Sequence, residues 1–222
     1  MSKLQMLNEF RALFMKHTVV TRNHLTPELA LRLITSASPL WSSPAENSPF
    51  VDPYWAFYWP GGQAVARYIL DNAEAVLHRN VLDIGCGCGA GAIAAALKEA
   101  KLVVANDIDI YAVEATRMNA DLNKIVNIQT STNNYIGTKC EQFDTILIGD
   151  MFYDEEFGQY LFNWLSEMTR HRKTILIGDP GRHGLTDARR RQMALLATYQ
   201  LTNETRRENH GFSQTTVWRL KE

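Results

Sequence analysis

The sequence predicts an α/β fold in which a largely parallel sheet carries helices on both faces and ends in an antiparallel hairpin. Two observations indicate this. From residue 81 onward, strand-like apolar runs alternate with helical patterns, which is the arrangement of a parallel sheet. Beyond residue 200, polar and apolar residues alternate instead, as in QTTVWRL, which is typical of antiparallel strands.

Five apolar runs are expected to form the parallel strands: Val81–Gly85, Leu102–Asp107, Asn127–Thr132, Thr145–Asp150 and Thr174–Asp179. The fourth and fifth runs share the hexapeptide TILIGD. The helices between strands are expected at Ala90–Lys98, Tyr111–Asn123 and Glu155–Thr169. The chain should then continue with a helix at Asp187–Thr198 and with hairpin strands at Gln200–Glu208 and Phe212–Leu220, separated by a turn at Asn209–Gly211.

Residues 1–50 are expected to form a helical extension in front of the main domain, residues 51–222. A first helix is predicted at Leu4–Lys16, and a second should begin at Thr26, where an N-cap residue precedes Pro27. Prolines then indicate irregular chain up to Pro53, and a helix is predicted at Gln63–Asn72. The basic first segment also fits a mitochondrial presequence, although a first helix of the folded protein is the preferred interpretation.

Composition narrows the class of function. The chain has 222 residues, 23 basic and 24 acidic side chains and a formal net charge of −1, so it carries no global basic field for nucleic acid. No apolar stretch approaches the ~20 residues that span a bilayer, so no membrane segment is expected. The three cysteines have no histidine near them in sequence, so a metal site is not expected either.

The segment VLDIGCGCG predicts a ligand-binding turn between a strand and a helix. Gly85, Gly87 and Gly89 allow a sharp turn and a close approach of ligand to backbone. The GxGxG spacing differs from the GxGxxG of dinucleotide-binding proteins. Asp83 inside the strand suits the cationic end of an amino-acid-like ligand better than a diphosphate.

The next strand supplies a second anchor. Asp107 closes it and is placed to bind ribose hydroxyls, with Ile108 against an adenine ring. The two motifs in series predict a nucleoside ligand. Taken alone, each motif is more often a structural turn.

With these residues the sequence resembles the class I methyltransferases, Rossmann-like proteins with a seven-stranded sheet and a terminal antiparallel hairpin that use S-adenosylmethionine. VLDIGCGCG matches their first motif and VVANDID their second. The resemblance implies that the turn from Gly85 to Gly89, with Cys86 at an x position, wraps the methionine part of the cofactor. It also implies that Asp107 holds the ribose.

The residues after the first TILIGD are the candidate catalytic group. Asp150-Met-Phe-Tyr153 fits an Asp-x-x-Tyr pattern found in a family of protein-lysine methyltransferases. Asp150 is expected to orient the lysine amine beside the methyl group, and Tyr153 to present its ring to an ammonium. The alternative is that Phe152 and Tyr153 simply cap the core. Asp179, the last residue of the second TILIGD, is expected to cap a turn or to line the groove where the substrate protein docks.

The resemblance can be narrowed by WPGGQ, GDMFYDE and IGDPGR, which together match the family of lysine methyltransferases of the electron transfer flavoprotein beta subunit. It implies that protein as the partner, S-adenosylhomocysteine as the product, and the mitochondrial matrix as the location. The cytoplasm is expected instead if the chain is bacterial or if its N-terminus is not a presequence. It also implies that Trp59 lies against the cofactor, although Trp59 could equally be a core residue. The segment STNNY departs from the family pattern, so Asn133 or Asn134 would replace the usual acid at the adenine edge.

Three alternatives remain open at this point. The chain could methylate a lysine of another protein, such as a ribosomal protein. It could be a binding module that keeps the fold and has lost activity, although the three glycines and Asp107 are all in place. A nucleotide-dependent oxidoreductase is disfavoured by the GxGxG spacing and by the terminal hairpin.

Overall fold

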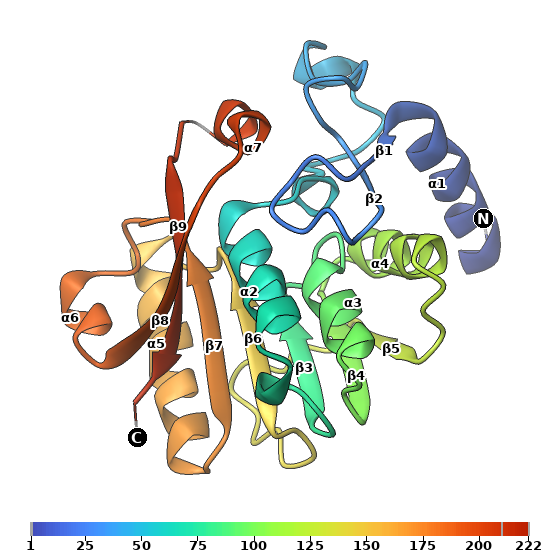
Figure 1. Ribbon diagram of the computed structural model, residues 1–222. Helices are drawn as coiled ribbons and strands as arrows, with labels where there is room; N and C mark the ends of the chain where they lie inside the picture. Colours follow the sequence, from blue (N-terminus) through green and yellow to red (C-terminus); the bar gives the residue numbers. More distant parts are fainter. Residues whose placement is uncertain (1, 210, 222) are drawn as a thin grey trace.

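The computed structural model describes residues 2–209 and 211–221 and is organised around one seven-stranded sheet (Figure 1). The strand order is β5-β4-β3-β6-β7-β9-β8. The strands are β3 (Asn80–Ile84), β4 (Leu102–Asn106), β5 (Ile128–Ser131), β6 (Thr145–Gly149), β7 (Thr174–Asp179), β8 (Met193–Gln200) and β9 (Gln214–Leu220). Strands β3 to β7 pair in parallel, whereas β9 is antiparallel to both β7 and β8. The predicted sheet and its antiparallel hairpin are therefore confirmed.

The two TILIGD segments lie side by side. Strand β6 pairs in parallel with β7 in the register that joins Thr145 to Thr174 and Gly149 to Gly178, so each residue lies beside its own copy. Strand β6 also pairs with β3 on its other side, which makes it central. Asp150 and Asp179 therefore lie at the ends of neighbouring strands, at one edge of the sheet.

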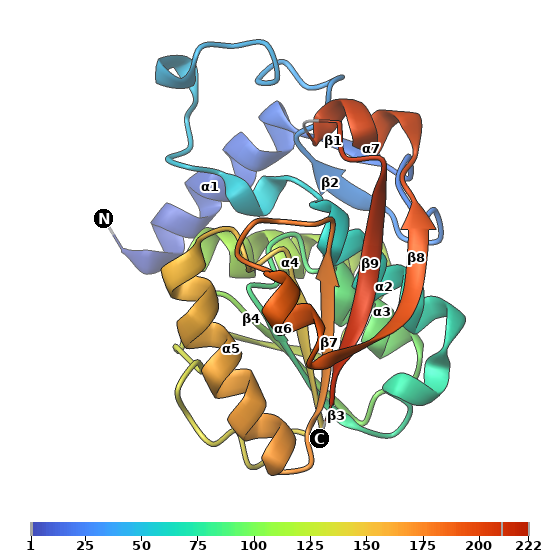
Figure 2. The ribbon, with the colours of Figure 1, turned by 90° about the vertical axis from the view of Figure 1, so that its left-hand side faces the viewer.

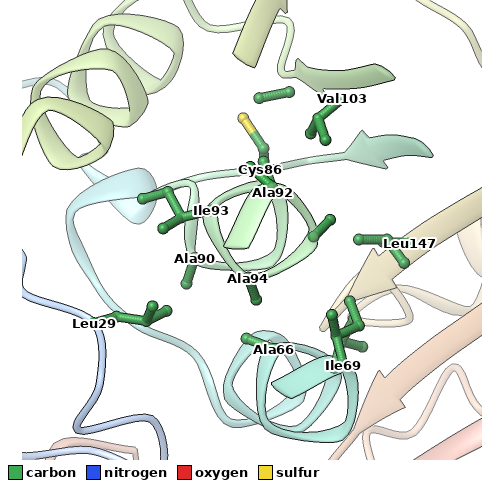
Figure 3. Close-up of a cluster of buried hydrophobic side chains, with 14 of the residues drawn as sticks. Leu29, Ala66, Ile69, Cys86, Ala90, Ala92, Ile93, Ala94, Val103 and Leu147 are labelled. Carbon is green, nitrogen blue, oxygen red and sulfur yellow. The ribbon is translucent and has the colours of Figure 1, made fainter. Parts of the chain in front are cut away.

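Helices cover both faces of this sheet, as Figures 1 and 2 show. Helices α2 (Pro60–Asp71), α3 (Ala90–Leu97) and α4 (Ile110–Leu122) contribute to one core, and α5 (Glu155–Arg170) packs on the opposite face. The first core lies between α2, α3 and the sheet, and its small residues let the helices approach closely (Figure 3). Its labelled members include Leu29, Ala66, Ile69, Ala90, Ala92, Ile93, Ala94, Val103 and Leu147.

Local sequence explains where the main helices begin. Pro60 occupies the first turn of α2, where a missing N–H costs nothing. The Asp109 carboxylate accepts from the Tyr111 N–H at 2.8 Å and starts α4. Asp154 accepts from the Phe157 N–H at 2.8 Å and starts α5, whose first turn is acidic. The helix predicted at Gln63–Asn72 is confirmed, with its start three residues earlier.

The N-terminal segment contains one of the two predicted helices. Helix α1 (Lys3–His17) is confirmed, but the helix predicted from Thr26 is wrong. Instead β1 (Val19–Thr21) and β2 (Leu31–Leu33) form an antiparallel pair. The side chain of Asn119 on α4 accepts from the Arg32 N–H at 2.8 Å, so a helix elsewhere in the chain completes the hydrogen bonding of β2. Such a partner is invisible in local sequence.

The C-terminal boundaries also differ from expectation. The helix predicted at Asp187–Thr198 is wrong beyond α6 (Asp187–Arg190), because the residues after it pair as β8 with β9. The strand predicted at Gln200–Glu208 is wrong as well: these residues end β8 and form α7 (Asn203–Glu208), which Thr202 caps. The expected turn includes residue 210, which lies outside the described residues. Within the described part of the chain, three short 3-10 segments are also present: Ala45–Asn47, Tyr54–Ala56 and Ala73–Ala75.

The N-terminal segment packs onto the main domain through aromatic and charged contacts. Phe10 and Phe14 of α1 are buried against Trp55, with ring centroids 5.2 and 5.5 Å away. Arg11 pairs at 2.6 Å with the buried Glu114 of α4. Helix α1 is thus part of the folded core. Within residues 2–209 and 211–221, none of the helices combines the length and the apolar character that crossing a bilayer requires.

Two neighbouring glycines of α2 provide a matched test of how closely this helix approaches the sheet. A Cβ on Gly61 would lie 2.6 Å from the Asp150 Oδ2 and closer still to the Gly178 carbonyl oxygen, whereas a Cβ on Gly62 would meet nothing nearer than 3.8 Å. We expect Gly61→Ala to lower the free energy of unfolding by about 2 kcal/mol or more. Gly62→Ala should leave it unchanged or raise it by up to about 1 kcal/mol. Urea denaturation measures both, and equal effects would contradict this packing.

Candidate functional site

The glycine-rich turn between β3 and α3 has the conformation that the sequence predicted. Gly85, Gly87 and Gly89 have φ values of 64°, 51° and 83°, a region that side chains other than glycine rarely adopt. A Cβ on Gly85 would come within 2.8 Å of the Met151 sulfur, and one on Gly89 within 2.6 Å of the Thr116 side chain. The turn therefore needs glycine for its backbone angles and for close packing.

A cavity lies against this turn. It brings together five of the predicted site residues, Trp59, Asp83, Gly85, Cys86 and Gly87. Its other lining residues come from the aromatic segment and α2, from the turn itself, from the start of α3, and from the end of β6: Phe57, Tyr58, Gly62, Val65, Cys88, Ala90, Gly91 and Gly149. The cavity thus touches the carboxyl ends of β3 and β6, where open α/β sheets bind ligands.

Asp83 places a buried carboxyl in this lining. Its Oδ2 accepts from the Ala92 N–H at 2.8 Å, inside the first turn of α3. Burial raises the pKa of Asp83 to about 7, although the Ala92 hydrogen bond opposes the rise. A cationic ligand group beside it would favour the ionised form.

Asp107 lies next to the turn, outside the lining of the cavity. Its carboxylate accepts from the Gly87 N–H at 3.2 Å and from the Asp109 N–H at 3.0 Å. A carboxylate has about four lone-pair sites, so two remain for further donors such as hydroxyls. Burial raises the pKa of Asp107, and the N–H donors oppose that rise.

Ile108 and Asn133 are exposed beside Asp107. Ile108 is 77% exposed, which is unusual for an isoleucine and leaves its apolar side chain open. The main-chain oxygen of Asn133 accepts from the Asn106 amide at 2.7 Å, which fixes the loop after β5 next to β4. Contact of these two residues with an adenine ring stays a prediction.

The two cysteines of the turn are buried thiols. Cys86 Sγ lies 3.4 Å from the Thr116 hydroxyl. Burial raises the pKa of Cys86 well above its ordinary value and that of Cys88 to about 12, so both remain protonated at neutral pH. Among the described residues, no cluster of three or more His, Cys, Asp or Glu side chains could hold a metal ion.

Asp150 is buried and fully hydrogen-bonded. Its Oδ2 accepts from the N–H groups of Gly61 and Gly62 at the start of α2, the second at 3.0 Å. Its Oδ1 accepts from Nε of Arg182 at 2.8 Å and forms an ion pair with Nη2 of the same guanidinium, also at 2.8 Å. Burial raises the pKa of the Asp150 carboxyl, and the Arg182 guanidinium opposes that rise. The residue also has φ of 58°, a costly conformation for an aspartate.

Arg182 completes this arrangement. Its guanidinium carbon lies 5.4 Å from the ring centroid of Trp59 and 5.8 Å from that of Phe212. One cation therefore contacts a carboxylate and two aromatic rings. Trp59 also lines the cavity, so the guanidinium lies one side chain away from it.

Asp179 and the residues around Tyr153 have separate roles. Asp179 Oδ1 accepts from the N–H groups of Gly181 and Arg182 at 2.6 and 2.8 Å, so the predicted turn cap is confirmed.

Phe152 is fully buried in the core on the α5 side, which agrees with the alternative that it caps the core. Tyr153 is different: it is 56% exposed and stacks on Phe157 at 5.5 Å.

Comparison with known proteins gives this site its context. A Danio rerio protein named electron transfer flavoprotein beta subunit lysine methyltransferase is 49% identical over 203 residues, which cover 90% of this chain and 79% of that protein. The Homo sapiens protein of that name is 41% identical over 95% of this chain and 81% of its own length. A Caenorhabditis elegans homolog is 40% identical over 97% of each chain. The chain belongs to this family.

More distant matches agree with the fold of this lysine methyltransferase family member. Residues 65–149 match the model of the ribosomal protein L11 methyltransferase (PrmA) family. The solved structure of N-methyltransferase NodS from Bradyrhizobium japonicum, in complex with S-adenosyl-L-homocysteine, has a TM-score of 0.52 at 15% identity, covering 69% of this chain and 83% of that one. The magnesium protoporphyrin IX methyltransferase of Synechocystis also has a TM-score of 0.52, at 17% identity over 71% and 80% of the two chains. The class I fold is thereby shown.

The sequence alone did not assign a role to three residues that contact the site from other parts of the chain: Arg182, Met151 and Phe212. Arg182 belongs to IGDPGR, which helped to identify the family but suggested no role. Met151 covers Gly85, and Phe212 reaches Arg182 from the residues just before β9. The available signal was a basic residue three positions after the end of the second TILIGD, at the edge of the sheet where the first copy ends in Asp150.

Asp179 generates a prediction on pH and stability. Its Oδ2 is buried and has no partner among the described residues, and burial, helped by the neighbouring Asp150 charge, raises its pKa to about 7. The unfolded pKa is lower, so the folded state holds this proton more tightly. The stabilisation is complete below about pH 4 and is lost as pH rises through about 7.

We therefore expect the free energy of unfolding of the Asp179→Asn variant, relative to the wild type, to improve as pH rises from 5 to 8. The difference should change by up to about 1.4 kcal/mol per pH unit, the limit for one group. Urea denaturation at several pH values measures it. Asp187→Asn is the control, because Asp187 is exposed and Arg190 lowers its pKa. A difference that stays constant with pH would contradict the shifted pKa of Asp179.

Proposed function

We propose that this chain transfers methyl groups from S-adenosylmethionine to lysine side chains of the electron transfer flavoprotein beta subunit, releasing S-adenosylhomocysteine. The observation that carries the proposal is the 40–49% identity, over 90–97% of the chain, to proteins named for that activity or as a homolog. The intact glycine turn and Asp107 support an active enzyme over an inactive binding module.

The residues that line the cavity, together with Asp107 and Ile108 beside the glycine turn, fit this cofactor. The turn from Gly85 to Gly89 gives close access to the backbone, and Asp83 offers a carboxyl to the cationic amino group of the methionine part. Asp107 retains lone pairs for ribose hydroxyls, and Ile108 offers an open apolar face to adenine. When bound, the cofactor supplies an electrophilic methyl group on a sulfonium.

The acceptor side lies at the carboxyl end of β6. Trp59 lies between the cavity and Arg182, and the Asp150 carboxylate fixes the start of α2 beside both. Tyr153 is exposed just after the end of β6, where its ring can contact an ammonium or a methylated amine. A free lysine has a pKa near 10.4, so fewer than roughly one in a thousand are deprotonated at pH 7. The site must therefore favour the free amine and hold it in line with the methyl group.

A ribosomal-protein substrate is the second candidate, and one observation bears on it. The L11 methyltransferase match covers residues 65–149 and ends before the Asp-x-x-Tyr segment. It therefore includes the glycine turn and leaves out the acceptor side. Because the match to the L11 methyltransferase family ends before the acceptor side, it gives no support for L11 as the substrate, and the flavoprotein is favoured. We place the activity in the mitochondrial matrix, as that substrate implies.

The direct test is methylation of purified proteins with labelled S-adenosylmethionine. We expect label on the electron transfer flavoprotein beta subunit, located on lysines by mass mapping, and none on ribosomal protein L11. An Asp150→Asn variant should lose more than about 100-fold in rate, as expected when a group that arranges the reacting atoms is changed. Label on L11 but not on the flavoprotein would overturn the substrate assignment.

Asp107 gives a prediction for the cofactor alone. Asp107→Ala should weaken binding of S-adenosylhomocysteine by about 1–3 kcal/mol, the range for hydrogen bonds to a charged group. Isothermal titration calorimetry measures this loss. Asp109→Ala is the matched control on the same loop: it removes the α4 cap and should lower stability by about 1 kcal/mol with little effect on affinity. Equal affinity in the Asp107 variant would remove this residue from the ribose site.

A further inference from the structure

We define the acceptor corner as Asp150, Arg182, Trp59 and Phe212. It contains the positive charge of the Arg182 guanidinium, for which methyl transfer to a lysine has no direct use. The Arg182 side chain is 19% exposed, its Nε donates to Oδ1 of the buried Asp150, and its Nη2 forms an ion pair with the same oxygen. Rings approach the guanidinium from two further elements, at 5.4 and 5.8 Å. A substrate amine that reaches this corner meets a carboxylate that is already paired.

We propose that Arg182 is a positioning residue that stays paired with Asp150 and neutralises it, so that the acceptor lysine enters the corner as a free amine. The inference rests on the proposed function. It assigns Arg182 a role in setting the charge of the corner and gives it no contact with the methyl group.

The chemistry of the acceptor explains why such a residue is needed. Only the free amine has the electron pair that forms the new N–C bond as the S–C bond breaks and its electrons return to sulfur. The ammonium proton must first pass to solvent. An unpaired Asp150 carboxylate would stabilise the ammonium and hold that proton in place, whereas a carboxylate–guanidinium pair has no net charge.

The contacts of Arg182 favour this fixed role over that of a plug displaced by the substrate. Asp179 accepts from the Arg182 N–H, and the Arg182 main-chain oxygen accepts from the Leu185 N–H at 3.0 Å, so the backbone is held at both ends. Displacing the side chain would leave Asp150 buried and unpaired, which is costly. A displaced plug predicts faster methylation when Arg182 is removed, and a fixed partner predicts slower methylation near neutral pH.

Other ionisable groups lie around the acceptor corner, and their effects on the pH profile must be distinguished from that of Arg182. Asp179 ends β7 and titrates near neutrality. Tyr153 lies just after β6, and its pKa is raised by burial and by the charges of Asp154 and Asp107. His183 is exposed on the same loop as Arg182. The Asp179→Asn variant therefore accompanies each pH profile, so that an inflection from Asp179 is recognised.

The experiment compares Arg182→Gln with Arg182→Lys, which keeps the charge. We measure kcat and kcat/KM for flavoprotein methylation from pH 6 to 10. Arg182→Gln should raise the apparent pKa of the rising limb by about one pH unit or more, the scale of a lost neighbouring charge. It should therefore lose about ten-fold in rate near pH 7 and recover near pH 10. Arg182→Lys should keep most of the wild-type profile.

A second readout does not depend on turnover. Calorimetric binding of the flavoprotein to the enzyme–S-adenosylhomocysteine complex, in two buffers of different ionisation enthalpy, counts the protons released. The wild type should release close to one proton per bound lysine at pH 7, and Arg182→Gln clearly fewer. The double variant Asp150→Asn/Arg182→Gln restores a neutral corner without an unpaired buried charge, so it should fold and release the wild-type number.

The outcomes separate the two proposals. If the wild type leaves the flavoprotein unmethylated, the proposed function fails and this inference fails with it. If the wild type methylates it but Arg182→Gln shows the same pH profile and proton count, only the role of Arg182 is overturned. A faster Arg182→Gln enzyme overturns it in favour of a displaced plug. An equal loss at every pH, with an unchanged proton count, indicates a merely structural role.

Discussion

The site depends on one buried carboxylate that links three elements. Asp150 lies at the end of the central strand β6, accepts from the first N–H groups of α2 and pairs with Arg182 after β7. Such a group is costly to bury and is stabilised only when its oxygens are satisfied, as they are here. The close approach of α2 depends on this bond and on the absence of a side chain at Gly61. The carboxylate thereby fixes where Trp59, the residue before α2, meets the cavity.

The two TILIGD strands have the same sequence, but their terminal aspartates have different roles. In-register pairing sets Gly149 beside Gly178, and both glycines face the main chain of α2. The strands are interchangeable in the sheet, and the difference lies in the contacts of the aspartates at their ends. Asp150 bonds to a neighbouring helix and to a neighbouring loop, whereas Asp179 bonds to its own turn. Both carboxyls are buried, but only the first has a cationic partner.

Sequence predicted the features that local pattern determines. The TILIGD runs are apolar because both faces of the sheet are covered, and glycines with positive φ act where they stand in the chain. Prediction failed where a distant partner decides. The leucines of β2 fit a helix or a strand, and Asn119, more than 80 residues away, completes the strand. Arg182 could not be assigned a role for the same reason: its carboxylate lies 32 residues earlier and one of its rings 30 residues later, and only the packed sheet brings them together.

The N-terminal segment supports the aromatic residues that lie over the glycine turn. Trp55 packs against Phe10 and Phe14, and its main chain lies over the turn, so that a Cβ on Gly87 would be 3.7 Å from the Trp55 Cα. The same aromatic segment continues to Trp59, which lines the cavity and contacts Arg182. Removing α1 would expose Trp55 and loosen the segment at one end, while Asp150 would still hold it at the other. The cofactor side of the site therefore depends on the N-terminal segment, and the acceptor side depends on the buried ion pair.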